Sequence, residues 1–72
     1  MLYKKIHIGE LIKSKVEEME ITVRHLAEVF RISENAVLEM FTKPDLPTGD
    51  LLKWSKLLRY DFFRIYSQHL IL

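Results

Sequence analysis

The 72-residue chain contains no cysteine, and only two glycines and two prolines. Without cysteine it cannot form a disulfide scaffold, a zinc ribbon or a thiol nucleophile, and this absence suits a reducing cytoplasm. Few glycines and prolines leave long stretches in which helices can form. Because 49% of the residues are hydrophobic, we expect a packed core rather than disorder.

Long apolar runs and a strong charge of either sign are also missing. No run approaches the roughly 20 apolar residues that a membrane-spanning helix needs, and the first ten residues lack the pattern of a signal peptide. We therefore expect a cytoplasmic protein with no membrane partner. The formal net charge of +1 does not by itself indicate nucleic acid, because many small DNA-binding domains are clearly basic.

The length predicts a single domain, residues 1–72, with a small core. A chain of this size buries only roughly 60% of the surface that its unfolded form exposes. A second subunit would add burial, so we expect a homodimer.

The two ends of the chain allow more than one interpretation. Residues 1–7 form an N-terminal arm, in which Lys4, Lys5 and His7 either follow a groove of DNA or only keep the end soluble. A short strand is also open there, because residues 6 and 8 are apolar at a spacing of two. Residues 67–72 form an apolar tail that docks either on the core or on a second subunit.

Hydrophobic side chains repeat at helical spacing along the chain, and no convincing strand pattern is found. A first helix begins at Ile8, and its apolar face carries Ile8, Leu11, Ile12, Val16 and Met19. Thr22 is a good N-cap for a second helix that runs through Phe30, and Ser33 is one for a third helix. The segment LAEVFRISENAVLEMF, residues 26–41, is thus two amphipathic helices joined by a tight turn, as in a helix-turn-helix.

Two further helices are predicted after a proline-containing break. The segment TKPDLPTGD, residues 42–50, ends the third helix, because the residue before a proline disfavours helical dihedrals. A fourth helix starts at Thr48 or Asp50, and Asp61 caps a short fifth helix. The aromatic residues of these helices follow core spacing, so we interpret them as core or subunit contacts rather than a stacking platform: Trp54, Phe62, Phe63 and Tyr66.

The order and spacing of these helices resemble the Cro/C1-type helix-turn-helix family, also called lambda-repressor-like or XRE. The segments that carry the resemblance are IGELIKS, ITVRHLAEVFRIS, AVLEMF and LLKWSKLLRYDFF. Ala27 stands where the family keeps a small residue at the helix crossing, and Ile32 and Val37 match its core positions. The resemblance implies an all-α, compact five-helix DNA-binding domain with a central helix-turn-helix.

Three positions depart from the family's pattern. Members often have glutamine where Val23 stands, glycine where Glu20 stands, and glycine in the turn where Arg31 stands. Val23 removes a usual phosphate-contacting amide. Arg31 either adopts a left-handed backbone conformation, at a cost of roughly 1 kcal/mol, or the turn is built differently.

The resemblance implies a sequence-specific transcriptional regulator with its recognition helix, residues 33–42, in the major groove of double-stranded DNA. A homodimer on a two-fold symmetric site is expected. Side chains presented to the bases would be Glu34, Asn35, Leu38, Glu39 and Thr42. Asn35 suits this role best because its amide can pair with adenine, whereas Leu38 could touch a thymine methyl and a carboxylate could accept from cytosine.

Contacts to phosphate would come from the flanks of the recognition helix. The candidates are the backbone N–H groups at Thr22 and Ser33 and the side chains of Arg24, Arg31 and Lys43. They have to offset Glu34 and Glu39, because carboxylates near a polyanion weaken the sequence-independent attraction. Glu34 also has a structural interpretation, since it stabilises the dipole of its helix without DNA.

No catalytic or metal-binding pattern is present in the sequence. The three histidines are far apart, and the chain has no glycine-rich phosphate loop and no G-x-S-x-G motif. We therefore expect no enzyme, metal, cofactor or small-molecule substrate. Two other functions stay open: a protein-interaction module in which exposed Leu38, between Glu34 and Glu39, contacts another protein, and a helical assembly module held together by apolar residues 70–72.

Overall fold

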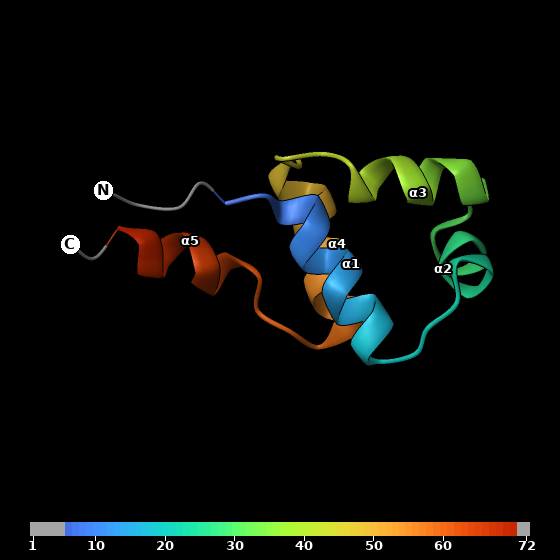
Figure 1. Ribbon diagram of the computed structural model, residues 1–72, viewed down its shortest axis with the longest axis horizontal. Helices are drawn as coiled ribbons and strands as arrows, with labels where there is room; N and C mark the ends of the chain where they lie inside the picture. Colours follow the sequence, from blue (N-terminus) through green and yellow to red (C-terminus); the bar gives the residue numbers. More distant parts are fainter. Residues whose placement is uncertain (1–5, 71–72) are drawn as a thin grey trace.

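The computed structural model describes residues 6–70, and five helices follow one another along this part of the chain (Figure 1). They are α1 (Ile8–Glu18), α2 (Val23–Phe30), α3 (Glu34–Phe41), α4 (Thr48–Leu58) and α5 (Phe63–His69). Residues 6–70 include no strand, so the all-helical prediction is confirmed for this part of the chain. The strand alternative at the N-terminus falls partly on residues outside it. Lys4 and Lys5 of the predicted arm lie outside the described residues.

Side-chain caps fix where the first three helices begin. The hydroxyl oxygen of Thr22 accepts a hydrogen bond from the N–H of His25 at 3.1 Å, and Ser33 accepts one from the N–H of Ala36 at 3.1 Å. Both predicted caps are therefore confirmed. His7 is not a free arm residue, because its Nδ1 accepts from the N–H of Glu10 at 3.2 Å and caps α1. The first N–H groups of a helix have no partner within the helix. His7 supplies an acceptor for one of them, and this explains why it belongs to α1 and not to a free arm.

The turn between α2 and α3 shows which of the two alternatives for Arg31 applies. Arg31 adopts a left-handed conformation with φ 59° and ψ 45°, and its N–H donates to the carbonyl of Ala27. Glu20, the other position where the family often has glycine, has φ 58° after α1. Each residue carries a cost of roughly 1 kcal/mol that glycine would avoid.

The core gathers along the inner faces of the first four helices. α1 packs against both α3 and α4, and α2 packs against α3. The buried apolar residues are Ile8, Ile12, Val16, Leu26, Ala27, Val37, Phe41, Leu51, Trp54, Leu58 and Phe62. The predicted apolar face of α1 is too wide, because Leu11 and Met19 lie at its flanks, 38% and 42% exposed.

Trp54 of α4 ties this core to α3. Its side chain is 1% exposed, and its indole N–H donates to the sulfur of Met40 at 3.3 Å. The ring centroid of Phe30 lies 4.7 Å away. A buried indole N–H needs an acceptor, so this contact makes the tryptophan compatible with the core.

The first turn of α1 is fastened to the end of α3. The N–H of Ile8 donates to the carbonyl of Pro44 at 3.0 Å, and the N–H of Gly9 donates to that of Lys43 at 2.9 Å. A Cβ atom on Gly9 would lie 2.6 Å from the carbonyl oxygens of Met40, Phe41 and Lys43. Only glycine permits this approach, so residue 9 fixes the position of α3 against α1.

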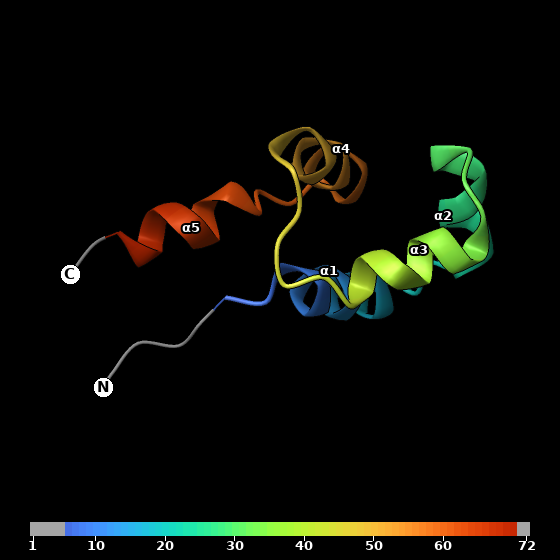
Figure 2. The same ribbon diagram turned by 90° about the horizontal axis from the view of Figure 1, so that it is seen from above.

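Helix α5 extends away from the other four (Figures 1 and 2), and none of its residues is buried. Asp61 accepts a hydrogen bond from the N–H of Arg64 at 3.2 Å, but the predicted cap is one residue off, because Phe62 occupies the N-cap position of α5. Tyr66 is half-buried, and the partial removal of its hydroxyl from water raises its pKa; the nearby Asp45 carboxylate adds to the rise. Residues 67–69 of the predicted apolar tail belong to α5, which continues to His69. Leu70 is 81% exposed, and residues 71 and 72 lie outside the described residues.

Candidate nucleic-acid interface

The outer side of α3 is free of contact with the core. Every predicted base-facing residue is exposed: Glu34, Asn35, Leu38, Glu39 and Thr42. Val37 on the inner side is fully buried. The helix is therefore held by one face and presents the other, as insertion into a groove requires.

The candidate phosphate-contacting residues lie around both ends of α3. The hydroxyl oxygens of Thr22 and Ser33 accept the capping hydrogen bonds at the starts of α2 and α3, and the backbone N–H groups of these two residues donate to no acceptor within residues 6–70. Arg24, Arg31 and Lys43 are exposed, and none of them forms an ion pair within residues 6–70. The backbone of Lys43 is fixed by its bond to Gly9, so its position relative to α3 is defined.

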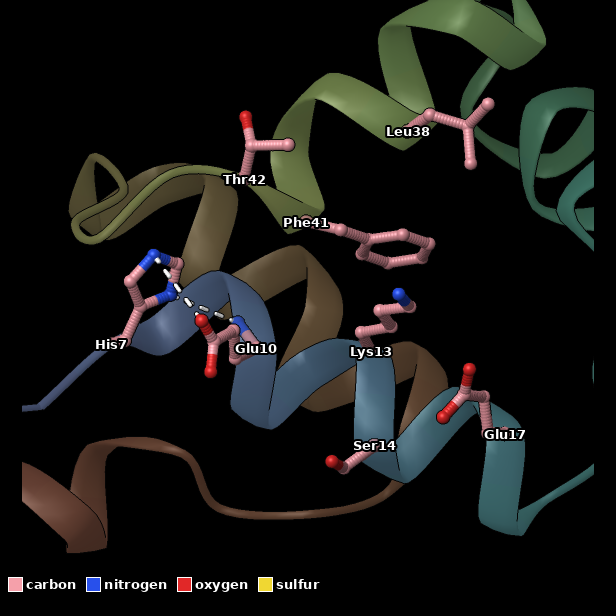
Figure 3. A pocket seen from close by; sticks show the side chains of 8 residues that line it. All are labelled: His7, Glu10, Lys13, Ser14, Glu17, Leu38, Phe41 and Thr42. Carbon is pink, nitrogen blue, oxygen red and sulfur yellow. Dashed lines mark hydrogen bonds and ion pairs between the residues drawn. The ribbon is translucent and has the colours of Figure 1, made fainter.

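A groove with a volume of about 730 Å³ opens between α1 and α3 (Figure 3). Its lining residues are His7, Glu10, Lys13, Ser14, Glu17, Leu38, Phe41 and Thr42. Lys13 and Phe41 point toward one another across it. The imidazole Nε2 of His7 lies 3.9 Å from a carboxylate oxygen of Glu10.

The α1 side of this groove was not predicted from the sequence. Glu10, Lys13, Ser14 and Glu17 recur at the spacing of one helical face, so the pattern was readable as a polar stripe. The sequence did not show that this stripe lies opposite Leu38.

Charge is divided unevenly between the two parts of the molecule. Residues 8–41 contain four Lys or Arg against seven Asp or Glu, a net charge of −3, whereas residues 48–70 contain four against two, a net charge of +2. α3 itself has two carboxylates and no Lys or Arg. Of the predicted phosphate-contacting cations, Arg24 and Arg31 therefore lie in a part of the chain that is acidic as a whole.

Other kinds of site find little support in this part of the chain. Within residues 6–70 no three His, Cys, Asp or Glu side chains gather to hold a metal ion. The described helices are all too short or too polar to cross a membrane. His25 is exposed at the start of α2, as a surface histidine would be.

Comparison with known proteins adds no family. Neither a known protein family, nor a curated protein, nor a solved structure matches the chain. What is established is the structure itself: residues 6–70 are all-helical, and two capped helices, α2 and α3, are joined by a three-residue turn.

Proposed function

We propose that the protein is a Cro/C1-type, lambda-repressor-like transcriptional regulator that binds double-stranded DNA by placing α3 in the major groove. The observation that carries this proposal is the exposed outer face of α3, which includes Asn35. A major groove about 12 Å wide admits an α-helix. The caps at Thr22 and Ser33 fix where α2 and α3 begin. They leave a short turn between the two helices, as a helix-turn-helix requires.

Recognition divides into positioning and reading. Arg24, Arg31 and Lys43 contact phosphates and set the register, without reading sequence. Asn35 reads adenine, because its carbonyl oxygen accepts from N6 and its amide donates to N7. Leu38 packs on a thymine methyl group.

The two carboxylates of α3 restrict the DNA sequences that this helix can bind. Glu34 and Glu39 can accept from the N4 amino group of cytosine, but repel the backbone. Binding is therefore weak and strongly dependent on salt.

A homodimer is part of this proposal, because paired half-sites about one helical turn apart need two copies of α3. Leu70, 81% exposed at the end of α5, is the apolar side chain that a second copy would cover. Leu70→Ser then lowers the mass measured by sedimentation equilibrium from dimer toward monomer. An unchanged mass would remove this residue from the interface.

Asn35→Ala tests the DNA-binding role, with Gln68→Ala on α5 as the matched control because it removes an exposed amide outside the site. Sites would be selected from random duplexes, and affinities measured by a gel-shift assay at low salt. The Asn35 variant is expected to lose about 1–3 kcal/mol on the selected site, and the control to bind as the wild type does. Wild-type protein with no preference over random duplex contradicts the proposal.

A protein-interaction module is the second candidate, and the groove between α1 and α3 favours it. Leu38 is 48% exposed and lines this groove together with Phe41, Glu10 and Glu17. Leu38→Ser should abolish a complex with a protein partner, whereas Leu52→Ser should not, although Leu52 is similarly exposed at 45%. In this case Asn35→Ala leaves the complex intact.

A further inference from the structure

Three exposed cations lie along α4 and at its C-cap, Lys53, Lys56 and Arg59, which we call the α4 stripe. At about 100° per residue, Lys56 lies about 200° around α4 from Trp54. Trp54 points inward and donates to Met40 of α3. Lys56 therefore faces away from α3. Lys53 lies only about 100° around the helix from Trp54 and lines a hollow with Ile32 and Met40, so the stripe extends from the outer side of α4 toward α3.

The charges of the α4 stripe are not neutralised within the described residues. The ion pairs of residues 6–70 are His7 with Glu10 and Lys15 with Glu18, so none includes a residue of the stripe. The surrounding part of the chain, residues 48–70, has a net charge of +2. A polyanion therefore meets attraction at α4, whereas it meets a net charge of −3 across α1 to α3.

We propose that the α4 stripe is a sequence-independent contact surface for the phosphate backbone of double-stranded DNA. The inference takes its ligand from the function proposed above, but assigns it a surface separate from the reading face of α3. Lys and Arg that neutralise phosphates release condensed counterions, and this release supplies most non-specific affinity. α3 has no Lys or Arg to make such a contribution, whereas the α4 stripe binds phosphates at a surface of its own.

The test compares two double variants that each remove two positive charges. Lys53→Gln/Lys56→Gln changes the α4 stripe, and Arg24→Gln/Lys43→Gln changes the flanks of α3. Binding to a fluorescent duplex of arbitrary sequence would be followed by anisotropy over a series of salt concentrations. Far-ultraviolet circular dichroism would verify the fold, which these exposed positions should not disturb.

The stripe variant is expected to lose roughly tenfold or more in affinity at about 50 mM salt, and its log–log salt slope should fall by about two. The α3-flank variant should lose less. An equal loss in both variants would show an effect of net charge alone and overturn the inference. Wild-type binding to phosphatidylglycerol vesicles but not to duplex would also overturn it.

Two outcomes separate this inference from the proposed function. If only the α3-flank variant loses affinity and Asn35→Ala loses recognition of a selected site, the stripe is not a DNA surface and the function stands. If the stripe variant loses affinity while Asn35→Ala has no effect, the stripe is supported and reading by α3 is not. A wild type that binds no duplex overturns both.

Discussion

Helices α3 and α4 differ in the two properties that a DNA-binding surface combines. α3 offers the polar face with an amide that can read bases, yet both of its charged side chains are carboxylates. α4 offers uncompensated cations, yet its outer side has no asparagine or glutamine. Under the proposed function, the polar surface that contacts bases and the positive charge that attracts DNA therefore belong to different helices. The contrast teaches that a helix exposed on one face does not by that fact carry the positive charge that binding to DNA needs.

The largest expected effect concerns how firmly each helix is anchored. Gly9→Ala places a Cβ 2.6 Å from three backbone carbonyl oxygens at the end of α3, and we expect it to lower the free energy of unfolding by about 3 kcal/mol. Gly49→Ala in the first turn of α4 meets no atom within 4 Å, so it should raise stability by about 0.5–1 kcal/mol through helix propensity. Urea denaturation measures both, and changes of the same sign would refute the anchoring of α3 by residue 9.

A smaller effect on stability is expected at the N-terminus of α3. Ser33→Ala removes the acceptor for the N–H of Ala36 and should cost about 1 kcal/mol. Ser14→Ala is the control, because Ser14 is exposed on α1 and caps no helix. Thermal unfolding compares the two variants. A Ser14 variant as destabilised as the Ser33 variant would remove the special role of the cap.

The smallest effect concerns the charge of α3 itself. Glu39→Gln removes one carboxylate from the exposed face and should raise affinity for duplex DNA about threefold at low salt, with the gain fading as salt is added. Glu28→Gln on α2 gives the same change in net charge at another exposed position. Anisotropy titrations would show the difference. If Glu28→Gln gains as much, α3 has no closer contact with DNA than the rest of the surface.

The elements of this fold were readable because they depend on local signals. Thr22 and Ser33 are recognisable caps, whereas the sequence left open whether Arg31 adopts a left-handed conformation or the turn is built differently. Five helices in this order were therefore predictable. Predicted burial was less accurate, since Leu11 and Met19 repeat at helical spacing but lie outside the strip that neighbouring helices cover.

The features that were not predicted depend on contacts between distant segments. Gly9 is one of only two glycines, but nothing near it in sequence shows that the end of α3 lies against it. Lys13 and Glu17 became part of the candidate site only because α1 packs beside α3. The charges of α4 were visible in the sequence, whereas the direction of Lys56 away from α3 needed the contact between Trp54 and Met40.

The contact between Trp54 and Met40 has a practical consequence. Trp54 is the single tryptophan of the chain, so intrinsic fluorescence excited at its absorption band comes from one known place. Its indole is shielded from water and touches a sulfur on α3. Any ligand that shifts α3 relative to α4 would change the wavelength or intensity of that emission. The protein therefore contains its own optical probe for movement of α3.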